Sequence, residues 1–334
     1  MDDPLWIDTH APSLADIPQA DVRDRLQEAV DEPVNLVVYG PEGAGKTAAV
    51  RALAEEAHAD PDNDLVELNV ADFFGMTKKE VSEDPRFAPF ISSKRRRNSS
   101  KADLINHVLK ESASYAPVSG EYNTILLDNA EAIREDFQQA LRRVMERHHE
   151  ATQFIIGTRQ PSKLIPPIHS RCFPVSMRAP TPEEIVAVLR DIVEAEGVDH
   201  DDDGLEFVAG YADGNLRKAV LGAQTTAEQA GEVTMNAAYE TLGEVGSDDA
   251  VESMLDDAEA GEFTNARKTL DDLLVDEGMD GEEVLRDLLR VGRSRYSGGD
   301  LAELHVLAGD VEFDLTQGNS DRIQLGRLLA ELGR

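Results

Sequence analysis

The chain has 334 residues, 41% of them hydrophobic, enough to bury the cores of two or three domains, and it contains no run of about 18 apolar residues, which excludes a membrane-spanning helix. Its 66 acidic and 33 basic residues give a formal net charge of −33; because the acids are dispersed and the hydrophobic pattern is regular, a folded protein from a cytoplasm with molar salt is favoured over a disordered acidic chain, and nucleic acid stays open as a partner. An acidic start without the layout of a signal peptide and a single cysteine, Cys172, predict a cytoplasmic protein.

Short apolar runs alternate with helical patterns in the first half of the chain. Helices are predicted over 46–57 and 134–150. The predicted strands are 35–40, 65–70, 124–128, 153–158 and 172–177. Strands that alternate with helices predict a parallel sheet covered on both faces, that is, a three-layer α/β domain.

A polar segment over 76–101 interrupts this alternation. It carries the basic cluster Lys94, Arg95, Arg96 and Arg97. Two interpretations stay open, a surface insertion and a contact to the phosphates of a nucleic acid.

The pattern becomes helical after 179–184, where Pro182 marks a helix start. Turn-rich breaks follow at 197–204 and 244–250. These breaks predict an α/β domain over 1–178, a small helical domain over 179–245 and an all-helical domain over 246–334.

The strongest local motif is GPEGAGKT, which fits G-x-x-x-x-G-K-[ST] between a predicted strand and a predicted helix. Such a P-loop directs backbone N–H groups and a helix N-terminus at phosphates, which predicts ATP as ligand. Lys46 is expected to reach the β- and γ-phosphates, and Thr47 to bind Mg²⁺. The predicted nucleotide-binding residues of the loop are Gly40, Pro41, Glu42, Gly43, Ala44, Gly45, Lys46 and Thr47.

Asp128 ends an apolar strand and is the expected second Mg²⁺-site acid. The next residue is Asn129, which can hydrogen-bond a water but cannot take its proton. Glu131 is a candidate for the missing carboxylate, but a helical turn there would direct it away from the side on which Asn129 lies.

Three weaker features are interpreted as structural. Residues 199–204 match half of an EF-hand loop, yet Gly210 stands where the bidentate acid is needed, so a turn with Asp203 near a helix N-cap is favoured. The pair His148–His149 is expected at a polar helix end. Cys172 is expected to be a small buried residue.

The order of the motifs resembles one family. The P-loop, the acidic strand, SRC at 170–172, GNLRKA at 214–219 and an all-helical tail are similar to the small subunits of replication factor C, an AAA+ sliding-clamp loader. The opening LWIDTHAPSLADI at 5–17 and the stretch 308–325 are similar to the same family.

This resemblance implies roles that spacing alone does not show. Arg171 would be an arginine finger acting in trans on the ATP site of a neighbouring subunit. Arg217 would contact the nucleotide from a helical lid over 179–245, and the domain over 246–334 would form a collar. The implied partners are the large subunit and other small subunits in a hetero-pentamer, the sliding clamp, and primer-template DNA held by backbone contacts.

The chain departs from the family pattern at three positions. The D-E-A-D box is D-N-A-E, with Asn129 at the base position; the sensor-1 asparagine aligns with Arg159; and the opening arginine is Ala11. This pattern predicts a subunit that binds ATP, hydrolyses it weakly and helps its neighbour hydrolyse. A non-hydrolysing scaffold subunit and another AAA+ DNA motor, such as a branch-migration helicase, are the alternatives.

Overall fold

The computed structural model describes residues 4–70, 72, 76–83, 100–115, 117–118, 120–243, 248–275, 279–316 and 320–333. The basic cluster at 94–97 lies outside the described residues. Contacts divide the chain into two compact units, Met1–Ala238 and Tyr239–Arg334, and each is described by itself. The finer division into three domains stays a prediction.

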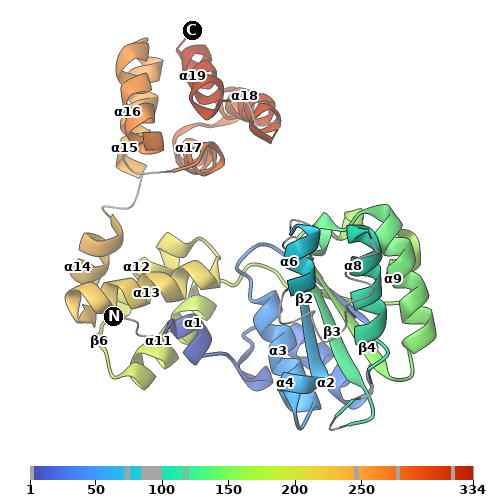
Figure 1. The fold of residues 1–334 in the computed structure, drawn as a ribbon. Coiled ribbons are helices and arrows are strands. Elements are labelled where there is room, and N and C mark those ends of the chain that lie inside the picture. The colour runs from blue at the N-terminus through green and yellow to red at the C-terminus, as the bar shows by residue number, and fades with distance from the viewer. Residues whose placement is uncertain are drawn as a thin grey trace. The chain divides into compact units, whose positions relative to one another are not determined.

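The first unit is built on a five-stranded parallel sheet with the order β2-β3-β4-β1-β5, of which β2, β3 and β4 are labelled in Figure 1. The strands are β1 (Leu36–Tyr39), β2 (Leu65–Asn69), β3 (Asn123–Asp128), β4 (Thr152–Thr158) and β5 (Phe173–Ser176). The five predicted strands are therefore confirmed. Because the strands are parallel, the segments that follow β1, β3 and β4 begin at the same edge of the sheet.

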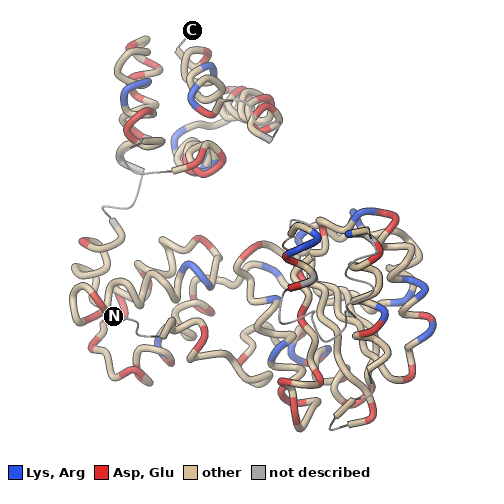
Figure 2. Tube along the Cα trace, viewed as in Figure 1, with Lys and Arg blue, Asp and Glu red and all other residues tan. Residues whose placement is uncertain are grey.

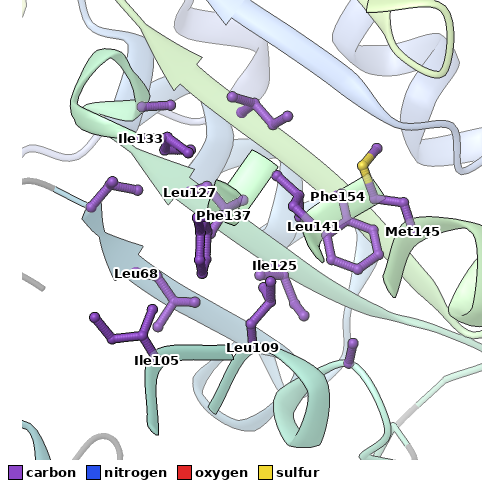
Figure 3. Close-up of a cluster of buried hydrophobic side chains, with 14 of the residues drawn as sticks. Leu68, Ile105, Leu109, Ile125, Leu127, Ile133, Phe137, Leu141, Met145 and Phe154 are labelled. Carbon is purple, nitrogen blue, oxygen red and sulfur yellow. The ribbon is translucent and has the colours of Figure 1, made fainter. Parts of the chain in front are cut away.

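Helices cover both faces of this sheet, as the predicted three-layer fold requires. The elements around the sheet are η1 (Leu14–Asp16), α2 (Ala20–Asp31), α3 (Lys46–Ala57), α4 (Pro61–Asp64), α6 (Lys78–Glu83), α8 (Lys101–Ser112), η3 (Ala130–Ala132), α9 (Glu135–His148), η4 (Pro161–Lys163) and α10 (Pro166–His169). Neighbouring residues of β3 point to opposite faces. Leu126 packs with α2 and α3, whereas Ile125 and Leu127 pack with α8 and α9 (Figure 3).

A helical segment completes the first unit. Its elements, with the helix at the start of the chain, are α1 (Trp6–Thr9), α11 (Pro182–Glu196), β6 (Asp199–His200), α12 (Asp202–Ala212), α13 (Leu216–Ala230), β7 (Glu232–Val233) and α14 (Met235–Ala238). The predicted helix start is confirmed, since Pro182 opens α11 and the N-cap Thr181 forms a capping box with Glu184. The backbone N–H of Trp6 donates to Gln224 Oε1 at 2.8 Å, which fixes α1 against α13.

One detail of this segment differs from the sequence prediction, and another agrees with it. Residues 179–243 are not helical throughout, because β6 and β7 pair as a short parallel ladder. The prediction that Asp203 lies near a helix N-cap is confirmed: Asp203 is in the first turn of α12, and the N-cap itself is Asp201, whose side chain accepts from the N–H of Gly204.

The second unit is all-helical, as predicted. Its elements are η5 (Tyr239–Gly243), α15 (Asp248–Glu259), α16 (Phe263–Val275), α17 (Gly281–Arg295), α18 (Gly298–Thr316) and α19 (Asp321–Leu332). Its core includes Leu270, Leu288 and Leu328. On α18, Ala302, Val306, Gly309 and Phe313 are exposed and share one helical face.

Acidic residues are spread over both units rather than gathered in one tail (Figure 2). Among the described residues, no helix is both long and apolar enough to cross a membrane.

Candidate functional site

The turn between β1 and α3 has the backbone of a phosphate-binding loop. Gly43 and Gly45 have φ values of +69° and +91°, a left-handed conformation that glycine adopts without a steric penalty. Gly45 is also the N-cap of α3, so the first turn of that helix opens at the loop. A helix N-terminus behind a glycine-rich turn offers unpaired N–H groups to an anion.

Lys46 lies over this loop. Its Nζ donates to the carbonyl oxygens of Gly40 at 3.0 Å and Pro41 at 2.7 Å. Burial lowers the pKa of Lys46, while the nearby carboxylates of Asp128 and Glu131 act in the opposite direction. The Lys46 ammonium group is thus held next to the loop and close to the carboxylates of Asp128 and Glu131.

Thr47 and Asp128 meet at the carboxyl edge of the sheet. Thr47 Oγ1 donates to Asp128 Oδ2 at 2.7 Å, and Asp128 Oδ1 accepts from the N–H of Asn129 at 2.9 Å. Hydroxyl and carboxylate oxygens suit Mg²⁺, which commonly uses one or two protein ligands and completes its shell with phosphate and water. The pair fits such a shared site; within the described residues no group of three or more His, Cys, Asp or Glu gathers for a metal held by protein alone.

Asn129 occupies a left-handed conformation, with φ 53° and ψ 44°, and is the N-cap of η3. Asparagine tolerates this backbone better than most residues, because its short side chain bonds locally. Asn129 therefore also suits the left-handed backbone at this position. The sequence showed the missing carboxylate but not this backbone conformation.

Glu131 is directed to the end of β4, in agreement with the expected turn away from Asn129. Its Oε2 accepts from Thr158 Oγ1 at 2.9 Å and from the N–H of Arg159 at 3.1 Å, and its Oε1 accepts from Arg159 Nε at 2.7 Å. Burial alone would raise the pKa of Glu131, but these hydrogen bonds outweigh burial and lower it to about 2. Glu131 is thus a fully ionised and fully engaged carboxylate, and a poor base.

Arg159 extends from Glu131 to the P-loop. Its Nη1 donates to Glu42 Oε2 at 2.9 Å, and its pKa is raised mainly by the hydrogen bond to Glu131. Sequence reasoning noted Arg159 as a departure from the family pattern but missed this network. The signal was weak, because Glu42 and Arg159 lie 117 positions apart.

The start of α13 touches the P-loop. The N–H of Leu216 donates to the carbonyl of Gly43 at 3.0 Å, and a Cβ at Gly43 would lie 1.9 Å from Asn215 Oδ1. Arg217, in the first turn of α13, is exposed. The predicted lid arginine therefore lies one residue from a direct contact with the loop.

Arg171 lies at the end of the sheet where β1 begins, opposite the end that carries the P-loop. Its carbonyl accepts from Asn35 Nδ2 at 3.4 Å, just before β1 begins, whereas the P-loop starts where β1 ends. At about 3.3 Å per residue, β1 separates the two by about 15 Å. The guanidinium of Arg171 contacts Glu146 at 2.5 Å and the carbonyl of Pro167 at 2.7 Å.

The features interpreted as structural behave accordingly. His148 ends α9 and His149 is its C-cap, so the pair does form a polar helix end. Cys172 is half-buried rather than fully buried as expected; it packs against the sheet core, and burial raises its pKa to about 12. A thiol with this pKa is not a nucleophile at neutral pH.

Comparison with known proteins assigns the fold to a family. The model of the AAA family, ATPases associated with various cellular activities, matches residues 36–180, and that of the replication factor C C-terminal domain matches residues 247–331. The replication factor C small subunit of Aeropyrum pernix is 34% identical over 98% of this chain and 95% of its own length. The chain belongs to the replication factor C small-subunit family.

Other family members agree with this assignment. The small subunits of Archaeoglobus fulgidus and Halobacterium salinarum are 31% and 29% identical, each over 98% of this chain and at least 95% of their own length. The family and fold class predicted from the sequence are confirmed, and with them a role in DNA replication and nucleotide binding.

A solved structure of Thermotoga maritima RuvB shares the fold, with a TM-score of 0.55, 14% identity, and coverage of 78% of this chain and 86% of that one. A second solved structure, titled as the RuvB Holliday junction branch migration motor, has a TM-score of 0.52 at 13% identity and covers 81% of each chain. At this identity the likeness concerns the fold alone.

Proposed function

We propose that this chain is a nucleotide-binding small subunit of a cytoplasmic replication factor C complex that loads a sliding clamp onto primed DNA. It binds ATP with Mg²⁺ at its own P-loop, hydrolyses it weakly, and donates Arg171 to the ATP site of a neighbouring subunit. The observation that carries this proposal is a contrast within one site. Thr47 and Asp128 lie in hydrogen-bond contact, as a shared Mg²⁺ site requires, whereas Asn129 has no carboxylate and the carboxylate of Glu131 is bonded to Arg159.

The binding half of the site follows from the loop and the pair beside it. The backbone of 40–47 and Lys46 hold the phosphates, and Arg217 reaches them from α13. Thr47 and Asp128 hold Mg²⁺, which when bound neutralises charge on the phosphate oxygens. Lys46 gives up its hydrogen bonds to the carbonyls of Gly40 and Pro41 when it turns to the β- and γ-phosphates.

The proposed weak hydrolysis follows from the residues around the attacking water. Hydrolysis needs a group that orients this water and accepts its proton in the transition state. Asn129 can do only the first, and Glu131, with its pKa near 2 and its oxygens already accepting hydrogen bonds, is a poor substitute. The chain therefore holds ATP longer than a subunit with a glutamate at position 129.

Action of Arg171 in trans is supported by its place in the fold. It lies at the sheet edge opposite its own P-loop, about 15 Å away along β1, so it does not serve its own nucleotide. Its guanidinium is about one third exposed and is held by Glu146 and Pro167. An arginine so held is preorganised to stabilise charge on a phosphoryl group brought by a neighbour.

The proposed partners are the large subunit and other small subunits in a hetero-pentamer, the sliding clamp, and primer-template DNA bound through its backbone. The exposed face of α18 supports assembly, because the apolar side chains of Val306 and Phe313 on it are 68% and 66% exposed. Large apolar side chains that are exposed together often mark a protein–protein contact.

The test is the ATPase of the reconstituted complex, with and without clamp and primed DNA, in molar KCl. Lys46→Ala should abolish nucleotide binding by this chain. Arg171→Ala should lower the ATPase of the complex by about 10³-fold at the neighbouring site while leaving nucleotide binding by this chain unchanged. Full ATPase in the Arg171→Ala complex would refute the finger assignment.

A scaffold subunit with a permanently bound nucleotide is the second candidate, and the Glu131–Arg159 contact favours it, since it leaves no free base. Asn129→Glu separates the two. A gain in ATPase of the complex means that the site is competent and lacks only the carboxylate; no gain, with binding intact, favours the scaffold.

A further inference from the structure

Residues 5–19 connect two parts of the first unit, and we call them the strap. The strap begins with α1, which lies against α13 (Figure 1). The side chain of Trp6 is buried there, and its backbone N–H donates to Gln224 Oε1 at 2.8 Å. Gln224, itself buried, donates from Nε2 to Glu228 Oε1 at 2.8 Å, so its amide oxygen is the atom that faces Trp6. A buried hydrogen bond thus holds the strap on α13.

A second contact binds the strap to α11. His10 Nε2 lies within hydrogen-bond distance of Glu196 Oε1, which belongs to the last residue of α11. Both side chains are partly exposed, so this contact is weaker than the buried one. Two helices of the segment after residue 181 are therefore bound to the strap, one strongly and one weakly.

The other end of the strap belongs to the α/β core. Leu14 and Ile17 are buried and pack with residues of α2, α3 and β1. Gln19, also buried, exchanges two hydrogen bonds with the backbone of Arg178: its Nε2 donates to the carbonyl at 2.9 Å, and its Oε1 accepts from the N–H at 3.0 Å. Because Arg178 lies between β5 and α11, the strap is fixed at the stretch that links the sheet to the helical segment.

The middle of the strap is short and stiff. From His10 to Leu14 the chain takes four peptide steps, which span at most about 14 Å. Pro12 lies in this stretch, where it fixes its own φ and restricts the residue before it to an extended backbone. The helices α11 and α13 can therefore move far from the core only after Trp6 and His10 have detached from them.

The start of α13 shows what such a movement would release. Leu216 is the first residue of α13, so its N–H has no partner within its own helix, and it donates instead to the carbonyl of Gly43 in the P-loop at 3.0 Å. This bond exists only while α13 is seated on the loop. In the proposed function the nucleotide lies between the P-loop and Arg217 of the same helix, so it leaves when α13 moves away.

We propose that the strap holds α13 on the P-loop, and that its detachment from Gln224 and Glu196 is the step that frees α13 and allows the nucleotide to dissociate. The control of dissociation rests on the proposed nucleotide-binding function, whereas the holding of α13 does not. Because hydrolysis at this site is weak in that function, dissociation is the main route by which ATP leaves. A strap that slows dissociation therefore prolongs the ATP-bound state.

The experiment follows the strap, the helix and the nucleotide in the full-length chain in molar KCl. Trp6 is the single tryptophan of the sequence, so its emission reports docking of the strap. Hydrogen exchange at the Leu216 N–H, measured by NMR without nucleotide, reports seating of α13. The dissociation rate of ATP with Mg²⁺ reports release.

Gln224→Ala removes the acceptor of the buried Trp6 N–H. The emission of Trp6 should move towards that of the unfolded chain, and exchange at Leu216 and ATP dissociation should each become about tenfold faster, as expected for the loss of one buried hydrogen bond. His10→Ala removes only the exposed contact and should accelerate both by about two- to fivefold.

Thr226→Val is the matched control, because Thr226 is also buried on α13 but its hydroxyl donates to the carbonyl of Gly222 in the same helix; it should leave all three readouts as in the wild type. Unchanged Trp6 emission in Gln224→Ala, or a changed emission with wild-type exchange at Leu216, would overturn the holding of α13. Faster exchange with an unchanged ATP dissociation rate would overturn the control of release. If the wild type binds no ATP, the proposed function falls, whereas exchange at Leu216 still decides whether the strap holds α13.

Discussion

Glu131→Gln should destabilise the first unit in a pH-dependent way. Contacts to Arg159 and Thr158 lower the pKa of Glu131 from 4.5 to about 2. At about 1.4 kcal/mol for each pKa unit, this corresponds to about 3 kcal/mol of stability carried by the ionised carboxylate. Half-exposure of Arg159 reduces the figure, so about 2 kcal/mol is expected at pH 7.

The sign follows from the lowered pKa. A carboxyl group that is more acidic in the folded state stabilises that state fully above its unfolded pKa, and the contribution is lost as pH falls through the folded value. The difference in unfolding free energy between wild type and Glu131→Gln should therefore be constant above about pH 5 and shrink between pH 4.5 and about 2.

Thermal unfolding in molar KCl at several pH values measures this difference. A loss of about 2 kcal/mol should lower the Tm by about 4–8 °C for a unit of this size. Glu42→Gln is the control: its partner is the same arginine, but its exposed contact should contribute less than about 1 kcal/mol. If the two variants unfold alike, or if the Glu131→Gln difference persists undiminished in acid, the assignment of the strong contact is wrong.

Three further predictions concern the backbone and the cysteine. Gly43→Ala should cost about 2 kcal/mol in thermal unfolding and weaken ATP binding, because its Cβ would strike Asn215, the N-cap of α13, from a left-handed backbone; wild-type stability would refute the loop–helix contact. Asn129→Ala should lose about 1 kcal/mol whereas Asn129→Gly should not; equal losses would mean that the side chain, not the backbone conformation, matters there. Cys172 should resist alkylation at pH 8 in the folded protein and react once it is unfolded, as its pKa of about 12 requires; rapid labelling of the native chain would contradict its burial.

The parallel sheet was predictable because each strand is a short apolar run and the motifs sit at its ends. β3 shows this: 124–128 was predicted and Asn123–Asp128 is observed. The candidate metal pair Thr47–Asp128 followed for the same reason, since both residues end up at one edge of a parallel sheet.

The remaining details depend on contacts between distant segments. The β6–β7 ladder has only two residues in each strand, too short for a periodic signal. Asp203 was predicted near the N-cap of α12, but composition does not tell which of the neighbouring aspartates is the cap, and in the structure it is Asp201. The hydrogen bonds that join Glu131, Arg159 and Glu42 depend on how the segments after β3, β4 and β1 approach one another. No local sequence pattern predicts that approach.

The separation of the P-loop and Arg171 along β1 gives the subunit a direction. If the P-loop at one end of β1 takes an arginine from one neighbour, and Arg171 at the other end enters the site of another neighbour, the two contact surfaces differ. A two-fold symmetric dimer built on one such contact cannot use both surfaces. Subunits joined through these surfaces pack head to tail, so the association is heterologous. Such an assembly either closes into a ring or stays open as a helix or arc, with one unmatched site at each end. If Arg171 acts as proposed, the order of subunits around the assembly has a polarity, and exchanging two neighbours is not equivalent to reflecting the ring.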